Sequence, residues 1–228
     1  MTADAQPAAV VEERPTGSDA SRDPDWTVVI PVKAPTRAKT RLAPDLDPAA
    51  RERLAAAFAV DTFAAAVGAA GVRRVLVVGE ADATRRAAEA AGAEYVAESG
   101  GTGLRAAIAD GVRAAGPGDV AVLLGDLPCL RSEDLADALA DAAGHPLAFV
   151  RDADGTGTTL ATARAGVGFA AHFGDGSAAR HAEAGFVELG ASSSSSWTSL
   201  RRDVDTAAAL AEAVALGVGP ATTAALAG

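Results

Sequence analysis

The sequence predicts an α/β fold built on a mostly parallel sheet that is covered on both faces. From Trp26 onward, short apolar runs alternate with Ala-rich amphipathic segments, at the spacing of βαβ units. The run over residues 119–126 is apolar on both faces, which is typical of a strand between two layers of helices. Consecutive parallel strands would be joined by right-handed crossovers.

The elements expected in the first part of the chain follow one another regularly. A strand over residues 26–32 is followed by a helix over residues 47–70, with Asp47 as N-cap and Pro48 in its first turn. Next, strands and helices alternate over residues 72–80, 81–92, 93–98, 101–116, 119–126 and 132–144.

In the last third of the chain, two strands are expected next to one another, followed by short helices. The strands cover residues 146–152 and 156–163, and a short helix begins near Ser177. The serine run 192–196 is expected to be a loop, and a closing helix over residues 203–217 is capped near Asp205 or Thr206. Because no linker or internal repeat interrupts this pattern, we expect one domain over residues 26–228.

Composition and charge exclude several classes of protein. A net charge of -10 argues against a general nucleic-acid surface, which relies on a basic field. No apolar run approaches the roughly 20 residues that span a bilayer, so no membrane association is expected. Residues 1–25 mix proline, charged and small residues, and are expected to be a disordered tail rather than a signal peptide. Cys129 is the only cysteine, which excludes an internal disulfide and fits a cytoplasmic location.

A basic loop follows the first expected strand of this acidic chain. Ligands of open parallel sheets bind at the carboxyl ends of strands, near the switch in strand order. Lys33, Lys39 and Arg41 lie in that loop, where Arg41 suits bidentate contact with phosphate and the lysines act as point charges. Neither a P-loop nor a dinucleotide-binding glycine pattern is present. The alternative interpretation is a solvated basic loop.

Carboxylates at two places in the chain suit a magnesium site. Asp126 ends the apolar strand over residues 119–126, beside Gly125 and before Pro128. Mg²⁺ usually takes one or two protein carboxylates together with substrate phosphate oxygens. Asp203 and Asp205 alternate along an extended segment, so we expect one to face the site and the other to cap the final helix. We assign Asp205 to the metal and keep Asp203 as the alternative; Asp126 could instead cap the helix after it.

A second anion site is expected from two glycine-rich segments. Thr156, Thr158 and Thr159 surround Gly155 and Gly157, while Gly174, Gly176 and Ser177 lead into a helix N-terminus. Free backbone N–H groups there would bind phosphate or carboxylate. The structural alternatives are a β-hairpin turn and an ordinary N-cap. Arg180 and His181 follow one turn later, and His181 is interpreted either as an acid or base or as a surface histidine.

Taken together, six segments resemble one known family across Trp26 to Leu216. They are "VVIPVKAPTRAKTRL", "GTGLRAAI", "LLGDLPCL", "DADGTGTTL", "FGDGSAARH" and "RRDVDT". Their joint occurrence in this order resembles the 2-phospho-L-lactate guanylyltransferase family, whose actinobacterial members act on phosphoenolpyruvate in making coenzyme F420. The resemblance implies a Rossmann-like, nucleotide-diphospho-sugar transferase-like fold.

The resemblance also implies roles for particular residues. Lys33, Lys39 and Arg41 would contact the phosphates of GTP, and Asp126 and Asp205 would hold Mg²⁺. The nucleotide would lie at Pro31, Lys33, Gly103 and Leu104. The three-carbon acid would be gripped at Thr158, Gly174 and Ser177. Arg105 stands where the family usually has Asn, which puts the contact with base or ribose in doubt.

The reaction implied by the resemblance needs no general base. A phosphate oxygen of the acid, already anionic, attacks the α-phosphorus of GTP in line, and pyrophosphate leaves; cations offset the repulsion between the two anions. Competing interpretations are another nucleotidyltransferase of the same fold, acting on a molybdopterin or a sugar phosphate, and a non-catalytic nucleotide-binding module. The sequence leaves the choice between phosphoenolpyruvate and 2-phospho-L-lactate open. It also leaves the oligomeric state open, with a homodimer among the options.

Overall fold

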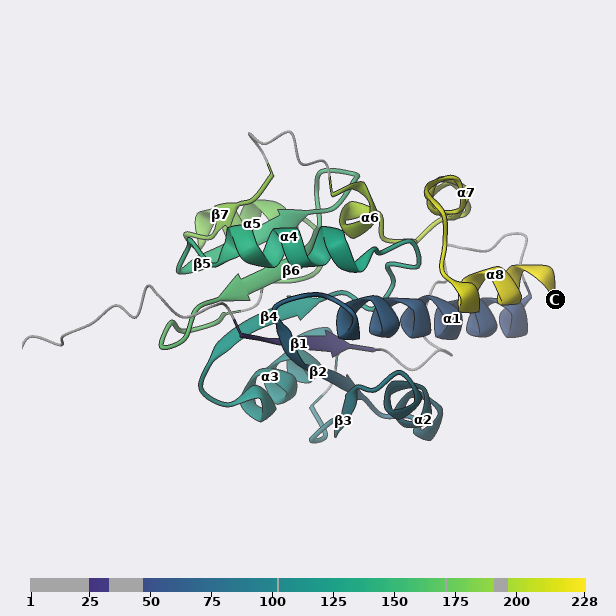
Figure 1. Cartoon of the computed structure of the whole chain (residues 1–228), viewed down its shortest axis with the longest axis horizontal. Coiled ribbons are helices and arrows are strands. Elements are labelled where there is room, and N and C mark those ends of the chain that lie inside the picture. Colours follow the sequence, from purple (N-terminus) through teal and green to yellow (C-terminus); the bar gives the residue numbers. More distant parts are fainter. Residues whose placement is uncertain (1–24, 33–46, 102, 171, 191–196) are drawn as a thin grey trace, which may run out of the picture.

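The computed structural model describes residues 25–32, 47–101, 103–170, 172–190 and 197–228. Seven strands form one sheet in the order β3-β2-β1-β4-β6-β5-β7 (Figure 1). Their bounds are β1 (Trp26–Pro31), β2 (Val72–Gly79), β3 (Glu94–Ala97), β4 (Asp119–Leu123), β5 (Leu147–Arg151), β6 (Thr158–Ala163) and β7 (Val187–Glu188). The predicted α/β class and mostly parallel sheet are therefore confirmed.

Strand directions divide the sheet into two parts. β3, β2, β1 and β4 are parallel neighbours, whereas β6 runs antiparallel to both β4 and β5. The chain turns directly from β5 into β6, because only residues 152–157 lie between them and a short connection allows only antiparallel pairing. The hairpin that was the structural alternative for this segment is therefore present. Strand order reverses at β1, which lies between β2 and β4.

The helices cover both faces of the sheet. The helices are α1 (Pro48–Val67), α2 (Asp82–Ala90), α3 (Leu104–Ala115), α4 (Ser132–Ala142), α5 (Ser177–Glu183), α6 (Thr198–Arg201), α7 (Ala207–Leu216) and α8 (Pro220–Ala227). In β1, Val28 and Ile30 pack in the cluster that contains residues of α1, α2 and α4. Val29 points to the opposite face and packs with residues of α3 and α5. Successive side chains of a strand alternate between faces, so an unbroken apolar strand needs both helical layers.

Short elements near the C-terminus were not expected from the sequence. These are β7, α6 and α8, each with at most eight residues. α8 lies beside α1 (Figure 1), where the buried Asp61 carboxylate accepts hydrogen bonds from the backbone N–H groups of Ala221 (3.0 Å) and Thr222 (2.8 Å). A contact between positions so far apart in the chain leaves no local pattern in the sequence.

Among the described residues, no helix is long and apolar enough to cross a bilayer.

Candidate active site

A pocket of about 470 Å³ opens at the carboxyl ends of β1 and β4. Pro31 ends β1, and Leu124, Gly125 and Asp126 follow β4; all four line the pocket. Because β6 is antiparallel to β4, its first residue, Thr158, lies at the same edge of the sheet and also lines the pocket. The pocket therefore lies where strand order reverses, the place where open α/β sheets bind ligands.

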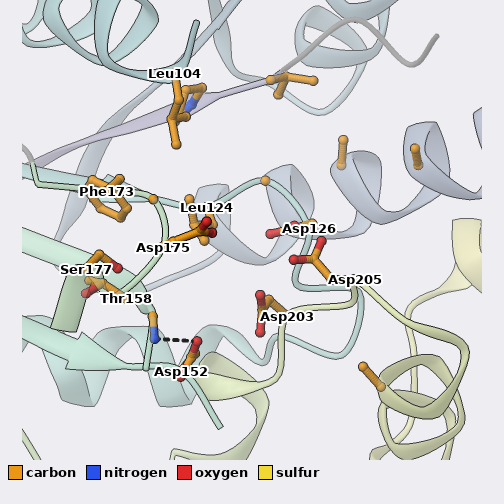
Figure 2. Close-up of a pocket in the computed structure, with 18 of the residues that line it drawn as sticks. Leu104, Leu124, Asp126, Asp152, Thr158, Phe173, Asp175, Ser177, Asp203 and Asp205 are labelled. Carbon is orange, nitrogen blue, oxygen red and sulfur yellow. Dashed lines mark hydrogen bonds between the residues drawn. The ribbon is translucent and has the colours of Figure 1, made fainter. Parts of the chain in front are cut away.

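The pocket has an apolar wall and a polar wall. Small and apolar residues of three helices form the first, namely Ala55, Ala56, Ala59 and Phe63 of α1, Ala83 and Ala87 of α2, and Leu104 of α3. On the other side, Thr156, Thr158 and Ser177 contribute hydroxyl groups. Figure 2 shows Thr158, Ser177 and Phe173 together on one side, with Leu104 above them.

Six aspartates line the pocket, namely Asp126, Asp152, Asp154, Asp175, Asp203 and Asp205. The described lining residues include no lysine, arginine or histidine. Arg202 forms an ion pair with Asp154 (3.2 Å) from outside the lining. An anionic ligand therefore meets an acidic wall and needs cations to bind there.

Backbone hydrogen bonds bring the separated aspartates together. The N–H of Val204 donates to the carbonyl of Asp126 (3.1 Å), so the segment with Asp203 and Asp205 lies along the loop after β4. That loop is in turn held to α1, since the N–H of Leu127 donates to the Thr62 hydroxyl (3.1 Å). Figure 2 shows Asp126 and Asp205 next to each other, with Asp203 on the same side of the pocket.

This arrangement corrects two expectations about the aspartates. Asp203 and Asp205 both line the pocket, and neither caps α7, because Thr206 is its N-cap and accepts from the Ala209 N–H (3.1 Å). A backbone bend at Asp205 and Thr206 interrupts the alternation expected of a regular strand. The alternative role of Asp126 as a helix cap is also wrong, since the next helix, α4, has Arg131 at its N-cap.

The oxygen atoms of these carboxylates suit a hard divalent cation that is completed by substrate. Among the described residues, no three His, Cys, Asp or Glu side chains form a metal-binding group by themselves. Mg²⁺ commonly takes one or two carboxylates and fills its remaining positions with water and phosphate oxygens. The paired approach of Asp126 and Asp205 fits that requirement (Figure 2).

Two of the N–H groups that were expected to be free at the start of α5 are bonded within the protein. The Ser177 N–H donates to the Gly174 carbonyl (3.0 Å), and the Ala178 N–H donates to the Thr156 carbonyl (3.1 Å). These bonds close the glycine-rich turn and hold it against the β5–β6 turn. The side-chain hydroxyl groups of Thr158 and Ser177 are among the polar groups of this wall.

Asp152 shapes the turn that carries Thr158. Its carboxylate accepts from the N–H groups of Thr156 (2.9 Å) and Gly157 (2.7 Å). A Cβ atom at Gly157 would lie 2.2 Å from Oδ2 of Asp152, so this turn requires glycine there. The glycines of this turn were identified from the sequence, but the hydrogen bonds that the Asp152 carboxylate accepts are visible only in the folded structure.

His181 is fully buried, which corrects its interpretation as a surface residue. Its ring lies among Phe149, Phe173 and Phe186, and its Nδ1 atom lies 3.0 Å from the Thr158 hydroxyl oxygen. Burial, together with the neighbouring His172, lowers the pKa of His181 to about 4. Helical periodicity places His181 one turn after Ser177, but only the packed structure shows which side chain it touches.

The remaining predicted residues divide into three groups. Lys33, Lys39 and Arg41 lie outside the described residues. Gly174 lines the pocket, whereas Gly103 forms the N-cap of α3 directly before the lining residue Leu104. Arg105 lies in a separate hollow together with Phe169, so its difference from the family's usual Asn does not alter the described lining of the main pocket.

The fold is that of nucleotide-diphospho-sugar transferases. A structure from Desulfovibrio desulfuricans, described as such a transferase, aligns with a TM-score of 0.57 at 18% identity, over 84% of this chain and 96% of its own. A nucleotidyl transferase from Methanothermobacter aligns with a TM-score of 0.52 at 17% identity, over 82% and 95% of the two chains. At these identities the likeness establishes the fold alone.

Sequence comparison identifies the family. The family described as "Guanylyl transferase CofC like" matches residues 26–226. A phosphoenolpyruvate guanylyltransferase of Geodermatophilus obscurus is 47% identical over 208 residues, which cover 89% of this chain and 94% of the relative. One from Streptomyces coelicolor is 48% identical over 203 residues, covering 87% and 94%. The chain therefore belongs to the CofC-like guanylyltransferase family, and it is a nucleotidyltransferase enzyme.

Proposed function

We propose that this guanylyltransferase transfers GMP from GTP to the phosphate group of phosphoenolpyruvate, with Mg²⁺ bound and with release of pyrophosphate. The proposal is based on one pocket that has an apolar wall, a hydroxyl-bearing wall and aspartates beside both. The names of relatives at 47% and 48% identity support phosphoenolpyruvate as the acceptor. The step would belong to coenzyme F420 biosynthesis, as the family resemblance implies, and a cytoplasmic location stays a prediction.

The apolar wall suits the nucleoside of GTP. Alanine side chains of α1 and α2 and the Leu104 side chain leave a smooth surface for a flat base. Pocket walls that are mostly apolar, with a few polar groups, are typical of small-molecule sites. We assign Pro31, Gly103 and Leu104 to nucleotide binding on this basis and on the resemblance.

The hydroxyl-bearing wall suits a small acid. Thr158 and Ser177 are both buried, with 2% and 1% of their surfaces exposed, and their hydroxyl groups reach a ligand in the pocket. Gly174 lies beside them in the lining. A three-carbon acid with phosphate and carboxylate groups fits this wall better than a pterin or a hexose, which would bring polar groups to the apolar side.

The acidic wall explains why cations are needed. Asp126 and Asp205 would hold Mg²⁺, which when bound neutralises phosphate charge and orients the oxygens of the reacting groups. Lys33, Lys39 and Arg41, which lie outside the described residues, would add positive charge from the segment after β1. Asp126 and Asp205 lie next to each other in the pocket lining (Figure 2), which supports this pair as the metal ligands.

The chemical step is an in-line displacement. One phosphate oxygen of phosphoenolpyruvate forms a bond to the α-phosphorus of GTP, and the bond from that phosphorus to the bridging oxygen breaks, so pyrophosphate leaves with the electron pair. The attacking oxygen is already anionic, and no side chain has to remove a proton. The protein contributes by binding both anions in one orientation and by excluding water. Positioning of this kind can lower the activation barrier by several kcal/mol.

The proposal is tested by pyrophosphate release from purified protein with GTP and Mg²⁺. Phosphoenolpyruvate, 2-phospho-L-lactate, 3-phosphoglycerate and no acceptor should be compared at equal concentrations. We expect release that depends on phosphoenolpyruvate. Preference for 2-phospho-L-lactate would change the acceptor within the same reaction, whereas GTP binding without release for every acid would contradict the proposed function.

A further inference from the structure

One buried side chain contacts the hydroxyl-bearing wall and has no role in the proposed chemistry. His181 of α5 is 0% exposed, and Thr158 of β6 is its polar neighbour on the pocket side, with 3.0 Å between Nδ1 and the hydroxyl oxygen. Four rings surround the imidazole, those of Phe149, Phe173, Phe186 and His172, at centroid distances of 5.6, 5.3, 4.9 and 5.6 Å. This cage fixes the orientation of the ring.

The second ring nitrogen determines which tautomer is present. The backbone N–H of His172 points at Nε2 of His181, with 3.3 Å between the nitrogens. A backbone N–H can only donate, so Nε2 has to accept and carries no hydrogen. In the neutral ring the hydrogen is then on Nδ1. His181 therefore presents a donor, not an acceptor, to Thr158.

The charge state of the ring is consistent with this tautomer. Burial is the main cause that lowers the pKa of His181 to about 4, and nearby His172 and Arg180 lower it further, while a hydrogen bond to the Ser177 backbone acts in the opposite direction. The ring is therefore neutral at pH 7. The Arg180 guanidinium itself is turned to the His172 carbonyl (2.9 Å).

The tautomer decides what the Thr158 hydroxyl can do. Its oxygen faces an N–H on the side of His181, so its own hydrogen cannot be donated in that direction. Thr158 also lines the pocket. We propose that His181 is a positioning residue, which holds the Thr158 hydroxyl group as a hydrogen-bond donor to an anionic oxygen of the acceptor acid. This inference rests on the proposed function and adds a residue that does not touch the substrate.

The polarity of this arrangement favours anions. A carboxylate or phosphate oxygen only accepts hydrogen bonds at neutral pH. If the Thr158 hydroxyl donated its hydrogen to a histidine nitrogen, its oxygen lone pairs would face the anion instead, which is repulsive. The N–H groups of Ser177 and Ala178 are bonded within the protein. With these two backbone donors occupied, the direction of the Thr158 hydroxyl hydrogen affects how well this wall binds an anion.

The tautomer is tested directly by long-range ¹H–¹⁵N NMR of the imidazole rings. The chain contains three histidines, so the spectrum has three ring patterns, and His181→Phe identifies the one from His181. At pH 7 we expect Nδ1 to carry the hydrogen and Nε2 to be unprotonated. A hydrogen on Nε2, or on both nitrogens, would overturn the inference.

The consequence for the acceptor is tested by steady-state kinetics of a double-mutant cycle. His181→Phe keeps an aromatic ring in the cage but has no donor, whereas His181→Asn can place an amide N–H near the position of Nδ1. A hydrogen bond to a charged group corresponds to roughly 10- to 100-fold in affinity. We expect His181→Phe to raise KM for the acid by about 10-fold or more, with KM for GTP unchanged, and His181→Asn to restore most of the loss.

Thr158→Val supplies the matched background for this cycle. If His181 acts through the Thr158 hydroxyl, then His181→Phe causes no further rise in KM for the acid once that hydroxyl is absent. Equal fold-changes in both backgrounds, or parallel losses for GTP and acid, would show a merely structural role and overturn the inference. Wild-type protein that uses none of the acids would instead overturn the proposed function, whereas an active wild type with an unaffected His181→Phe variant contradicts only the role of His181.

Discussion

At the scale of single residues, the site depends on carboxylates and hydroxyl groups held by bonds to other parts of the chain. Asp126 follows β4, and its carbonyl accepts from Val204, which lies between Asp203 and Asp205. The same backbone contact therefore sets the relative positions of the proposed metal ligands. Replacing a ligand side chain should leave this backbone contact in place.

Asp126→Asn is expected to remove most of the activity while the protein stays folded. Loss of a metal ligand forfeits several kcal/mol of charge stabilisation, which corresponds to roughly a 100- to 1000-fold fall in kcat. Pyrophosphate release and circular dichroism check the two parts of the prediction. Asp137→Asn on the exposed side of α4 is the control, and near wild-type kcat in Asp126→Asn would contradict the metal assignment.

Asp110 makes the folding stability of the protein depend on pH in the acid range. The backbone N–H of Ser99 is the main cause that lowers the pKa of Asp110 to about 2, followed by the Ser99 hydroxyl and Arg113. Because the pKa of Asp110 is lower in the folded than in the unfolded chain, its carboxylate stabilises the fold at pH values above the unfolded pKa, near 3.8. This stabilisation is lost as the pH falls toward 2. The bonds at Ser99 hold the segment before Gly103.

Asp110→Asn should therefore destabilise the protein at pH 6 more than at pH 3. Urea unfolding of wild type and variant at both pH values measures this difference. The gap between the two free energies of unfolding should shrink at pH 3, because the Asp110 carboxyl of the unfolded chain is then mostly protonated and folding has to release that proton. A constant gap would show that the charge of Asp110 is unimportant for stability.

Several site residues could be predicted from the sequence because the signal is local. Asp126 closely follows an apolar strand and Thr158 begins one, so a strand assignment is enough to bring both to the edge of the sheet. The common orientation of Asp203 and Asp205 and the bonded N–H group of Ala178 depend on long-range contacts, with Asp126 and Thr156 respectively. The sequence contains no local pattern for such contacts, so neither feature could be predicted from it.

At the scale of elements, α3 approaches the sheet unusually closely. Gly111 lies in the middle of this helix, and a Cβ atom there would lie 2.2 Å from Val29 Cγ1 and 2.8 Å from Val78 Cγ2. Glycine is unfavourable inside helices by about 1 kcal/mol relative to alanine. Its presence indicates that close packing on β1 and β2 outweighs helix propensity.

Gly111→Ala is expected to lower the free energy of unfolding by about 1–3 kcal/mol, because overpacking exceeds the gain in helix propensity. Chemical denaturation measures the change. Ala109→Gly, on the exposed side of the same helix, isolates propensity and should cost about 1 kcal/mol. A stabilised Gly111→Ala variant would show that α3 can move away from the sheet without cost.

At the scale of the whole molecule, the C-terminal helices close the fold around the site. Asp61 of α1 accepts from the first turn of α8, and the Gly219 N–H before α8 donates to the Pro128 carbonyl in the loop after Asp126 (2.9 Å). α7, which precedes α8, contributes Ala209 to the pocket lining. The end of the chain is therefore connected both to α1 and to the loop that carries the site.

Asp61→Ala should release α8 and lower the free energy of unfolding by about 1–3 kcal/mol, because two backbone N–H groups lose a buried acceptor. Hydrogen exchange over residues 220–228 measures the local effect and should become faster. Asp137→Ala, at an exposed position of α4, serves as the control. Unchanged exchange in Asp61→Ala would contradict the role of this carboxylate in holding α8.

In the proposed reaction, one pocket joins the GMP part of GTP to phosphoenolpyruvate. The most direct test is ³¹P NMR of wild-type protein with GTP, phosphoenolpyruvate and Mg²⁺. We expect the phosphomonoester signal of phosphoenolpyruvate to be replaced by two coupled diphosphate signals, with one pyrophosphate formed for each acceptor consumed. Formation of GDP and inorganic phosphate, or GTP that stays intact beside unreacted phosphoenolpyruvate, would contradict it.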